Sequence, residues 1–330
     1  MSLAGRRVVV TGADGFIGSH LTEKLVRAGA EVTAFCFYNS AGSLGWLDKS
    51  EPDVLSSLDV RLGDIRDARF VEQACQGASV VFHLAALIAI PYSYAAAESF
   101  IDTNVRGTLN VLEAVRRSQC ELLVHASTSE VYGTPDSLPI VESHPLKAQS
   151  PYSASKIAAD KLCESFHCSY GVPVLTLRPF NTYGPRQSAR AIVPTILAQA
   201  LSGGRTIHLG NLAPKRDLTF ISDTVRGFVA AGDATGLAGR TIQLGTGRSE
   251  SIAEMVRLAS EICGVELQVE EDVQRLRPQA SEVMVLQADP SLARELLGWS
   301  AKTTLEEGMI QTADWMRSNL SRYAADRYSI

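Results

Sequence analysis

A tyrosine and a lysine lie four residues apart, as Tyr152 and Lys156, at the start of a predicted helix. This spacing puts the phenol and the ammonium group on one face of the helix. Free tyrosine titrates near pH ~10, and an adjacent cation favours the phenolate, so the pair could supply a base near neutral pH. The same spacing also arises on solvated amphipathic helices. The pair therefore gains meaning only from the motifs around it.

A polar cluster follows a predicted strand at residues 122–126 and reads Ser127-Thr128-Ser129-Glu130. A carboxylate and a hydroxyl near a Tyr/Lys pair can move protons during a reaction. We therefore take Thr128, Glu130, Tyr152 and Lys156 as candidate catalytic residues. The structural alternative is ordinary hydrogen bonding at the strand end for Ser127 and Thr128, and a solvated carboxylate for Glu130.

Composition restricts the function classes. A chain of 330 residues can bury one large core or divide its core between a large and a small lobe. Its hydrophobic content of 45% and charged content of 20% are typical of a globular enzyme. The net charge of −5 argues against non-specific nucleic-acid binding, which depends on basic patches. It leaves a phosphorylated ligand possible, because a few local arginines and helix N-termini suffice.

The six cysteines show no C-x-x-C pairing, and no histidines stand at metal-ligand spacing. We therefore expect reduced thiols and no metal site. The apolar run at residues 8–10 is too short for a signal-peptide core. The apolar run at residues 80–90 contains His83 and stops at Pro91, so we expect it not to span a bilayer. These features favour a cytoplasmic protein without a membrane contact.

Short apolar strands alternate with amphipathic helices through the first half of the chain. This alternation predicts an α/β fold with a Rossmann doubly wound parallel sheet and a smaller C-terminal α/β lobe. After about residue 181 the segments become less regular, so we predict domains at 1–180 and 181–330, with part of 217–246 returning to the first. Strands are expected at residues 8–10, 31–37, 60–62, 80–84, 122–126 and 174–177, and helices at 68–76, 98–118, 152–170, 253–263 and 291–297.

Three glycines follow the first strand, as Gly12, Gly15 and Gly18. They permit a tight turn, a close approach of the backbone to a pyrophosphate, and close packing of helix on strand. An acidic residue for the ribose 2′-hydroxyl normally ends the second strand. Residues 36–40 contain none, and Asn39 could bind either a hydroxyl or a phosphate. No arginine stands there, so the sequence favours NAD but does not exclude NADP.

An ordered set of motifs extends this pattern over nearly the whole chain. With these motifs the chain resembles the extended short-chain dehydrogenase/reductases, the NAD-dependent epimerase/dehydratase family. The resemblance implies a Rossmann domain that holds NAD(P), a second lobe that holds a nucleotide sugar, and homodimers formed through a four-helix bundle. The motifs are the glycines, Asp64-Ile65-Arg66, His83-Leu84-Ala85-Ala86, Asn104-Val105-Arg106-Gly107-Thr108, Tyr152-x-x-x-Lys156, residues 178–185, residues 216–223 and Arg277-Pro278.

Family members differ after the fifth strand. Thr128-Ser129-Glu130 resembles the sugar-nucleotide 4,6-dehydratases, in which the Thr and Glu are catalytic, whereas 4-epimerases have no carboxylate there. Many dehydratases carry Asp where Ser129 stands, and the GDP-mannose dehydratases carry Ser. Residues 37–40, 45–47, 89–93 and 181–190 look similar to the dehydratases of the legionaminic acid pathway. That resemblance implies NAD-dependent 4,6-dehydration of a GDP- or UDP-linked N-acetylglucosamine.

The resemblance also carries site residues over to this chain. The implied substrate residues include two arginines, which suit a pyrophosphate but could instead form surface ion pairs. The implied cofactor contacts are Gly12, Asp14, Gly15, Phe16, Ile17, Gly18, Asn39, Asp64, Ile65, Leu84, Ala85, Ala86, Asn104, Ser127, Tyr152, Lys156 and Pro179. The implied substrate contacts are Ile88, Pro91, Thr128, Ser129, Glu130, Asn181, Arg190, Arg216 and Arg277.

Other functions remain open. A UDP-glucuronate decarboxylase would need a cation facing the sugar carboxylate, and Ala89-Ile90-Pro91 offers none. A 4-epimerase would leave Glu130 without a task. A non-catalytic dinucleotide sensor would retain the glycines but lose the Tyr152/Lys156 pair. The nucleotide base remains undetermined.

Overall fold

The computed structural model describes residues 2–323. In this part of the chain a seven-stranded sheet runs in the order β11-β6-β5-β4-β1-β2-β3, with every neighbouring pair parallel. The order reverses beside β1, which opens a crevice at the carboxyl ends of the strands. The predicted Rossmann fold is confirmed. The strands are β1 (Arg7–Thr11), β2 (Glu31–Phe37), β3 (Asp59–Gly63), β4 (Val80–His83), β5 (Leu122–Ala126), β6 (Val174–Pro179) and β11 (Thr241–Leu244).

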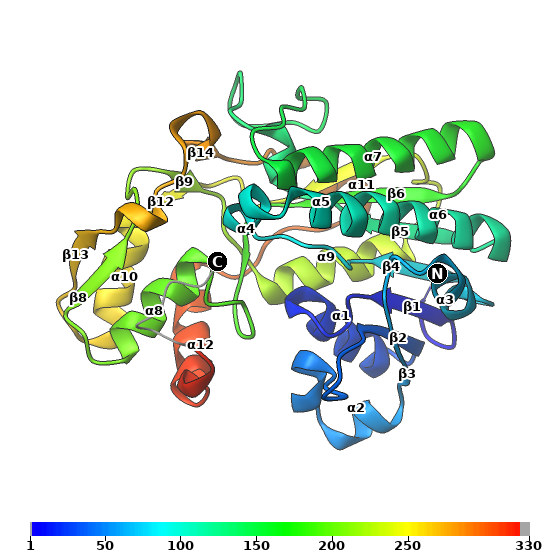
Figure 1. Cartoon of the computed structure of the whole chain (residues 1–330), viewed down its shortest axis with the longest axis horizontal. Coiled ribbons are helices and arrows are strands. Elements are labelled where there is room, and N and C mark those ends of the chain that lie inside the picture. The colour runs from blue at the N-terminus through cyan, green and yellow to red at the C-terminus, as the bar shows by residue number, and fades with distance from the viewer. Residues whose placement is uncertain (1, 324–330) are drawn as a thin grey trace.

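Helices cover both faces of this sheet, which is why its central strands are mostly apolar and almost entirely buried. One face packs on α3 (Ala68–Cys75), α6 (Gly107–Ser118) and α7 (Pro151–Tyr170). The other packs on α1 (Phe16–Arg27) and α9 (Ile221–Asp233). Figure 1 shows α6 and α7 on one side of the sheet and α1 on the other. The short helix α2 (Pro52–Ser56) precedes β3.

The second lobe lies at the far end of the molecule from α6 and α3 (Figure 1). The chain crosses between the lobes repeatedly, because α9 and β11 belong to the Rossmann part although they follow the first helix of the second lobe. Helix α11 (Ser291–Leu297), predicted in the smaller lobe, packs instead on β11 and α9 of the Rossmann part. The lobe's helices are α8 (Ile192–Leu201), α10 (Ile252–Cys263) and α12 (Leu305–Arg317). Its strand pairs are β7 (Thr182–Tyr183) with β10 (Thr219–Phe220), β8 (Thr206–Leu209) with β13 (Gln268–Glu271), and β9 (Lys215–Arg216) between β12 (Glu250–Ser251) and β14 (Val285–Leu286).

The helix predicted over residues 98–118 is confirmed, since helical backbone runs without interruption from residue 97 to residue 118, but it contains a π-helical segment that the prediction did not include. Two short helices, α4 (Ile90–Ala95) and α5 (Ala97–Phe100), lead into a π-helical turn at Ile101–Arg106, and α6 follows. The turn carries Asn104, whose amide bonds the backbone of Leu87 through both of its polar atoms. An inserted residue in a helix, as in a π turn, often serves a functional site.

Within residues 2–323, none of the helices has both the length and the apolar content that a membrane span requires.

Candidate active site

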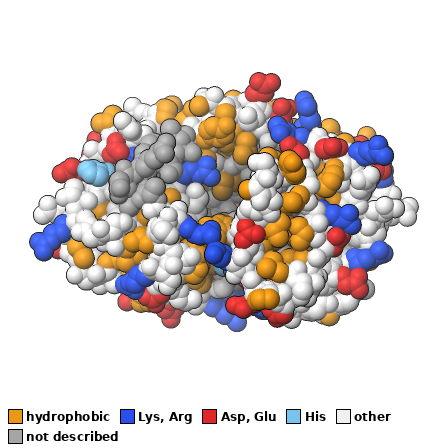
Figure 2. Space-filling view, turned by 60° about the horizontal axis from the view of Figure 1, so that its bottom comes forward, with side chains coloured by type: hydrophobic (Ala, Val, Ile, Leu, Met, Phe, Trp, Pro, Cys, Tyr) orange, Lys and Arg blue, Asp and Glu red, His pale blue; other side chains and the backbone are white. Residues whose placement is uncertain are grey.

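A cleft of about 1530 Å³ runs between the two lobes at the carboxyl ends of the parallel strands. Figure 2 shows the surface hollowed between the two halves, with basic side chains beside the hollow. The structure places every predicted site residue on its lining except Asn39 and Asn104. Residues from three different regions of the sequence, the glycine turn, the segment after β5 and the second lobe, therefore share one cavity.

The glycine turn between β1 and α1 has no room for side chains. A Cβ on Gly12, whose φ is +70°, would stand 2.9 Å from the backbone of Ala85. A Cβ on Gly18 would stand 1.9 Å from the carbonyl oxygen of Gly12. Among the described residues, no side chain caps the start of α1, which leaves its first N–H groups open to the cleft. This geometry fits the pyrophosphate of a dinucleotide.

The loop after β2 contains an acidic residue that sequence analysis missed. Asn39 does not line the cleft, because its amide bonds Ser43 through both polar atoms and shapes the loop. Asp48 lines the cleft and accepts hydrogen bonds from the Ser43 hydroxyl at 2.6 Å and from Leu44 N–H at 3.1 Å. Burial raises the pKa of Asp14, the other carboxyl at this end. Asp48 was missed because it lies well beyond the strand end.

Two predicted cofactor residues form hydrogen bonds with other side chains of the protein. The carboxylate of Asp64 accepts hydrogen bonds from Nε and Nη2 of Arg66, and these bonds lower the pKa of Asp64. The amide of Asn104, besides holding Leu87, donates to the Ser155 hydroxyl on α7 at 2.9 Å. Asn104 therefore fixes one wall of the cleft to the helix that carries Tyr152.

Helix α7 positions the Tyr/Lys pair. It begins with Pro151 and a capping box between Ser150 and Ser153, so its first turn is firmly defined. Tyr152 and Lys156 are both buried, and Nζ of Lys156 donates to the carbonyl oxygen of Ala126 at 2.7 Å. That carbonyl ends β5, so the pair lies directly beside the Thr128 segment.

Thr128 and Glu130 enter the cleft through a sharp change of direction after β5. Thr128 is extended, and its hydroxyl accepts the N–H of Glu130 at 3.2 Å to start a 3-10 turn at Ser129–Tyr132. The Glu130 carboxylate is half-buried and close enough to act on the pKa of both Tyr152 and Arg216. Glu130 therefore lies between the phenol and an arginine of the other lobe.

The structure does not show the expected lowering of the Tyr152 pKa. Burial raises the pKa of Tyr152 well above its usual range, a hydrogen bond with Thr128 partly offsets this, and the Glu130 and Asp160 carboxylates raise it further. Burial also lowers the pKa of Lys156, against the effect of Asp160. The pair needs a further positive charge nearby before the phenol can act as a base at neutral pH.

A buried ionic network behind the pair was not predicted. Asp160 accepts hydrogen bonds from the Ser127 hydroxyl at 2.9 Å and from Nε and Nη2 of Arg178 at 3.1 and 3.0 Å, and lies 3.3 Å from Nε2 of His125. Burial acts to raise the pKa of Asp160, but these partners hold it below its usual value. Asp160 is four residues after Lys156, so the face that carries Tyr152 and Lys156 was the available signal.

The substrate-lobe arginines lie at the other end of the cleft. The Arg216 side chain exposes only 7% of its surface. Both Arg216 and Arg277 pair with Glu282, a residue that sequence analysis missed. The Oδ1 atom of Asn181 is buried without a hydrogen-bond partner among the described residues and lines the cleft. Arg190, which is exposed, lies near Ser188, and Ile88 and Pro91 contribute an apolar wall.

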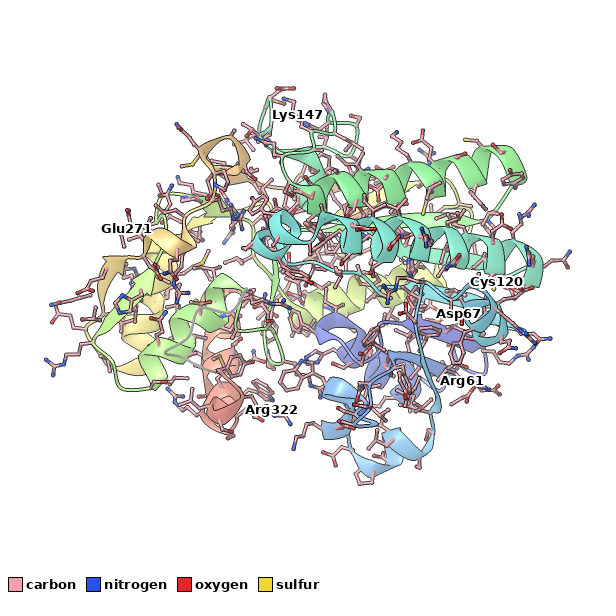
Figure 3. The ribbon with its side chains drawn as sticks, in the orientation of Figure 1. Arg61, Asp67, Cys120, Lys147, Glu271 and Arg322 are labelled. Carbon is pink, nitrogen blue, oxygen red and sulfur yellow. The ribbon has the colours of Figure 1, made fainter. Side chains whose placement is uncertain are left out.

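Aromatic contacts join the second lobe to the loop after β2. The rings of Trp46 and Trp315 meet edge to face at 5.5 Å, and the Arg322 guanidinium lies over Trp46 at 4.9 Å. Figure 3 shows Arg322 between α12 and the part of the Rossmann lobe that holds α2. We call Trp46, Trp315 and Arg322 the aromatic clasp. Two of its members, Trp46 and Arg322, also line the cleft.

The fold and site together define a dinucleotide-binding Rossmann enzyme with a Tyr/Lys pair and a carboxylate in one cleft. Residues 9–312 match the family model described as GDP-mannose 4,6 dehydratase. The chain therefore belongs to this family, within the NAD-dependent epimerase/dehydratase group of extended short-chain dehydrogenase/reductases.

Known relatives catalyse more than one reaction. The chain is 33% identical to a dTDP-glucose 4,6-dehydratase of Xanthomonas campestris pv. campestris, over 94% of this chain and 93% of the relative. It is 30% identical to UDP-glucuronic acid decarboxylase 1 of Xenopus tropicalis, over 98% and 75%. Its fold is similar to the crystal structure of DesIV, a dTDP-glucose 4,6-dehydratase from Streptomyces venezuelae with NAD bound, with a TM-score of 0.85, 29% identity, and 96% and 99% coverage.

Proposed function

We propose that the protein is an NAD-dependent nucleotide-sugar 4,6-dehydratase. The overall reaction oxidises the sugar at C4, eliminates water across C5 and C6, and reduces C6 to give a 4-keto-6-deoxy sugar. The observation that carries the proposal is the position of Glu130, a carboxylate that shares one cleft with Thr128, Tyr152 and Lys156. An epimerase has no step that requires this carboxylate, whereas a dehydratase must remove the C5 proton.

The protein's own residues move protons and hold oxygens. Tyr152 takes the proton of the sugar 4-hydroxyl, and the Thr128 hydroxyl bonds the same oxygen. The C4 ketone acidifies the C5 proton, which Glu130 removes and then delivers to the departing 6-hydroxyl, so that water leaves. Lys156 and Asn104 position α7 and the cleft wall around these groups.

The cofactor assigned to this cleft is NAD. The glycine turn and the open start of α1 would hold its pyrophosphate, and Asp48 and Asp14 lie at the end where its adenosine ribose belongs. Two carboxylates there repel a 2′-phosphate and so disfavour NADP. When bound, NAD supplies a reversible two-electron acceptor and a ring charge that favours the Tyr152 phenolate.

The substrate assigned here is a GDP- or UDP-linked N-acetylglucosamine. Arg216 and Arg277 are suited to its diphosphate, because guanidinium groups bond phosphate oxygens in pairs. The apolar wall that contains Ile88 and Pro91 faces the same cleft and gives the sugar a surface without charge. The resemblance of residues 89–93 and 181–190 to dehydratases that act on this sugar supports the assignment.

Decarboxylation of UDP-glucuronate is the second candidate, and one observation favours it. The decarboxylase requires a cation for the C5 carboxylate, and residues 89–91 offer none. Arg216 lies close enough to interact electrostatically with Glu130 and could supply that cation from the other lobe. The decarboxylase relative at 30% identity keeps this candidate open.

We also propose that two copies associate through α6 and α7. The π turn exposes Ile101 and α6 exposes Leu109, with 49% and 37% of their surface accessible. Exposed apolar side chains on a helix that packs beside α7 suit a four-helix bundle between two subunits. Sedimentation of the wild-type protein and of a Leu109→Glu variant should show a dimer and a monomer.

Incubation in heavy water separates the two reactions. The NAD-loaded protein is given UDP- and GDP-linked N-acetylglucosamine and UDP-glucuronate in separate reactions, and products are analysed by mass spectrometry. Loss of water with deuterium at C5 supports dehydration. Release of carbon dioxide from UDP-glucuronate would replace it by the second candidate, and inversion at C4 alone would contradict both.

A further inference from the structure

Two arginines of the substrate lobe share a single carboxylate. Arg216 Nη2 lies 3.2 Å from Oε1 of Glu282, and Arg277 Nη1 lies 3.8 Å from the same oxygen. The side chains of Arg216, Arg277 and Glu282 expose 7%, 27% and 17% of their surface, and all three line the cleft. We call Arg216 and Arg277 the arginine seat. One oxygen of Glu282 occupies the space between them.

The segment that carries Glu282 is tied to the opposite lobe. The Ser281 hydroxyl donates to the carbonyl oxygen of Gln149 at 2.6 Å and meets the Tyr94 hydroxyl at 2.6 Å. The Gln149 amide donates to the carbonyl oxygen of Ala280 at 2.8 Å. Glu282 is therefore held at the arginine seat by the bonds that its neighbours Ala280 and Ser281 make to the Rossmann lobe.

One carboxylate does not satisfy two guanidinium groups. Arg277 Nη1 is buried and has no hydrogen-bond partner among the described residues, since its approach to Glu282 is too long for one. Arg277 acts on Arg216 as a like charge, and the Glu130 and Glu282 carboxylates act against it. An anion with two charges and several oxygens could bond both guanidiniums where Glu282 bonds one.

We propose that Glu282 is a resident counterion of the arginine seat, which the diphosphate of the substrate displaces. This inference rests on the proposed function, because it takes the arginine seat as the diphosphate site. When no other anion is bound, the negative charge of Glu282 offsets the repulsion between the Arg216 and Arg277 guanidinium groups. It also competes with bound nucleotide, so it weakens retention of a nucleoside diphosphate and selects against anions that carry a single charge.

The test is nucleotide binding to the NAD-loaded protein. Isothermal titration with UDP, dTDP and GDP identifies the tightest binder, which is then used for the Glu282→Gln variant. Removing the competing charge should tighten binding about tenfold. In an Arg277→Gln background the same change at Glu282 should tighten binding much less, because the seat has lost one of its cations.

The control is Glu271→Gln, which removes an exposed carboxylate of the same lobe outside the cleft lining. Figure 3 shows Glu271 on β13 at the outer end of that lobe. The Glu271→Gln variant should bind the nucleotide with the same affinity as the wild type. Weaker or unchanged binding by Glu282→Gln, with an unchanged melting temperature, would show that Glu282 contacts the nucleotide or is neutral, and would overturn the inference.

The heavy-water assay keeps the two proposals apart. Tighter binding by Glu282→Gln together with no dehydration of any sugar supports the counterion and counts against the proposed reaction. Dehydration without tighter binding supports the reaction and counts against the counterion. Absence of nucleotide binding by the wild type and the variant alike would remove the arginine seat as a diphosphate site and the inference with it.

Discussion

At the scale of single residues, the catalytic groups come from segments that only the fold brings together. Glu130 follows β5 in the Rossmann lobe, Arg216 lies on β9 of the second lobe, and the two are close enough to interact electrostatically. The Glu130 carboxylate is half-buried, and it forms no direct ion pair within residues 2–323. Such a group can accept a proton and release it again during one catalytic cycle.

Replacing Glu130 with Gln should strongly slow elimination while leaving nucleotide binding intact. A general base typically contributes about 100-fold or more to the rate. We therefore expect the rate of 4-keto-6-deoxy product formation to fall by about that factor, with deuterium uptake at C5 lost in parallel. Turnover of Glu130→Gln at the wild-type rate would exclude Glu130 as the base.

Replacing Asp48 with Asn should shift cofactor preference toward NADP. The amide keeps an oxygen for the N–H of Leu44 but removes a negative charge from the ribose end of the cleft. We expect the ratio of NADP to NAD affinity to rise about tenfold. The matched control is Asp53→Asn in the first turn of α2, outside the cleft lining. Equal ratios in both variants would contradict the assignment.

The residues predicted from sequence and those missed differ in how far along the chain their partners lie. Tyr152 and Lys156 form one local spacing, and the glycines form one local turn, so both could be predicted. Asp48 meets the cleft through a folded loop, and Glu282 meets Arg216 over a separation of 66 residues. No local pattern encodes such pairings, because the fold alone sets them.

At the scale of elements, helix α7 carries three side chains of the site on one face. Tyr152 and Lys156 face the cleft, and Asp160 below them bonds Ser127, directly after β5, and Arg178 on β6. The network therefore fixes the helix to the two strands behind the catalytic segment. Such buried ionic groups are costly when one partner is removed, since the other charge remains without compensation.

Replacing Asp160 with Asn should destabilise the protein by about 3 kcal/mol, because the buried Arg178 guanidinium loses its counterion. The measurement is urea unfolding at neutral pH. Asp59→Asn, which breaks an exposed pair with Arg61 at 3.0 Å, should cost less than about 1 kcal/mol. A loss for Asp160→Asn no larger than that of the control would show that the network contributes little to stability.

The helix predicted over residues 98–118 illustrates a different limit. The periodic pattern continues through the π turn, so it gives no sign of the change in helix type. Asn104 lies in that turn and bonds Leu87 and Ser155 outside its own helix. The sequence contains this residue, but its partners are known only from the fold.

At the scale of the whole molecule, the two lobes meet at a half-buried histidine on α1. His20 bonds the carbonyl oxygen of Pro185 at 3.0 Å, and Arg186, with φ of +71°, pairs with Glu23 at 2.8 Å. Burial and the Arg186 charge lower the pKa of His20 to about 4. The folded protein therefore resists protonation at a position where the unfolded chain accepts a proton.

The stability contributed by neutral His20 should be lost on acidification. It is present above the unfolded pKa of about 6.5 and declines as pH falls toward the folded value of about 4. Between about pH 7 and about pH 5 the wild type should lose about 2 kcal/mol more than His20→Gln. His208→Gln, at an exposed histidine, is the control. Parallel pH profiles of wild type and His20→Gln would contradict this.

The aromatic clasp should govern how long the cofactor stays bound. Replacing Trp46 with Ala removes its contacts with Trp315 and Arg322, which together span the lobes. We expect NAD to exchange about tenfold faster, as followed by release of labelled NAD. Tyr170→Ala removes an aromatic ring with its own arginine partner outside the cleft lining and should leave exchange unchanged. Unchanged exchange in Trp46→Ala would exclude the clasp as a barrier.

The edge strand β11, which pairs with β6, follows the first helix of the second lobe, α8, in the sequence. A fragment ending at residue 180 would lack it, so the backbone of β6 would present an unpaired edge. The same fragment would lack α9 and expose the apolar face that Val225 and Phe228 cover. Shortened versions of this chain should consequently aggregate, and screening of inhibitors or crystals requires both halves in one polypeptide.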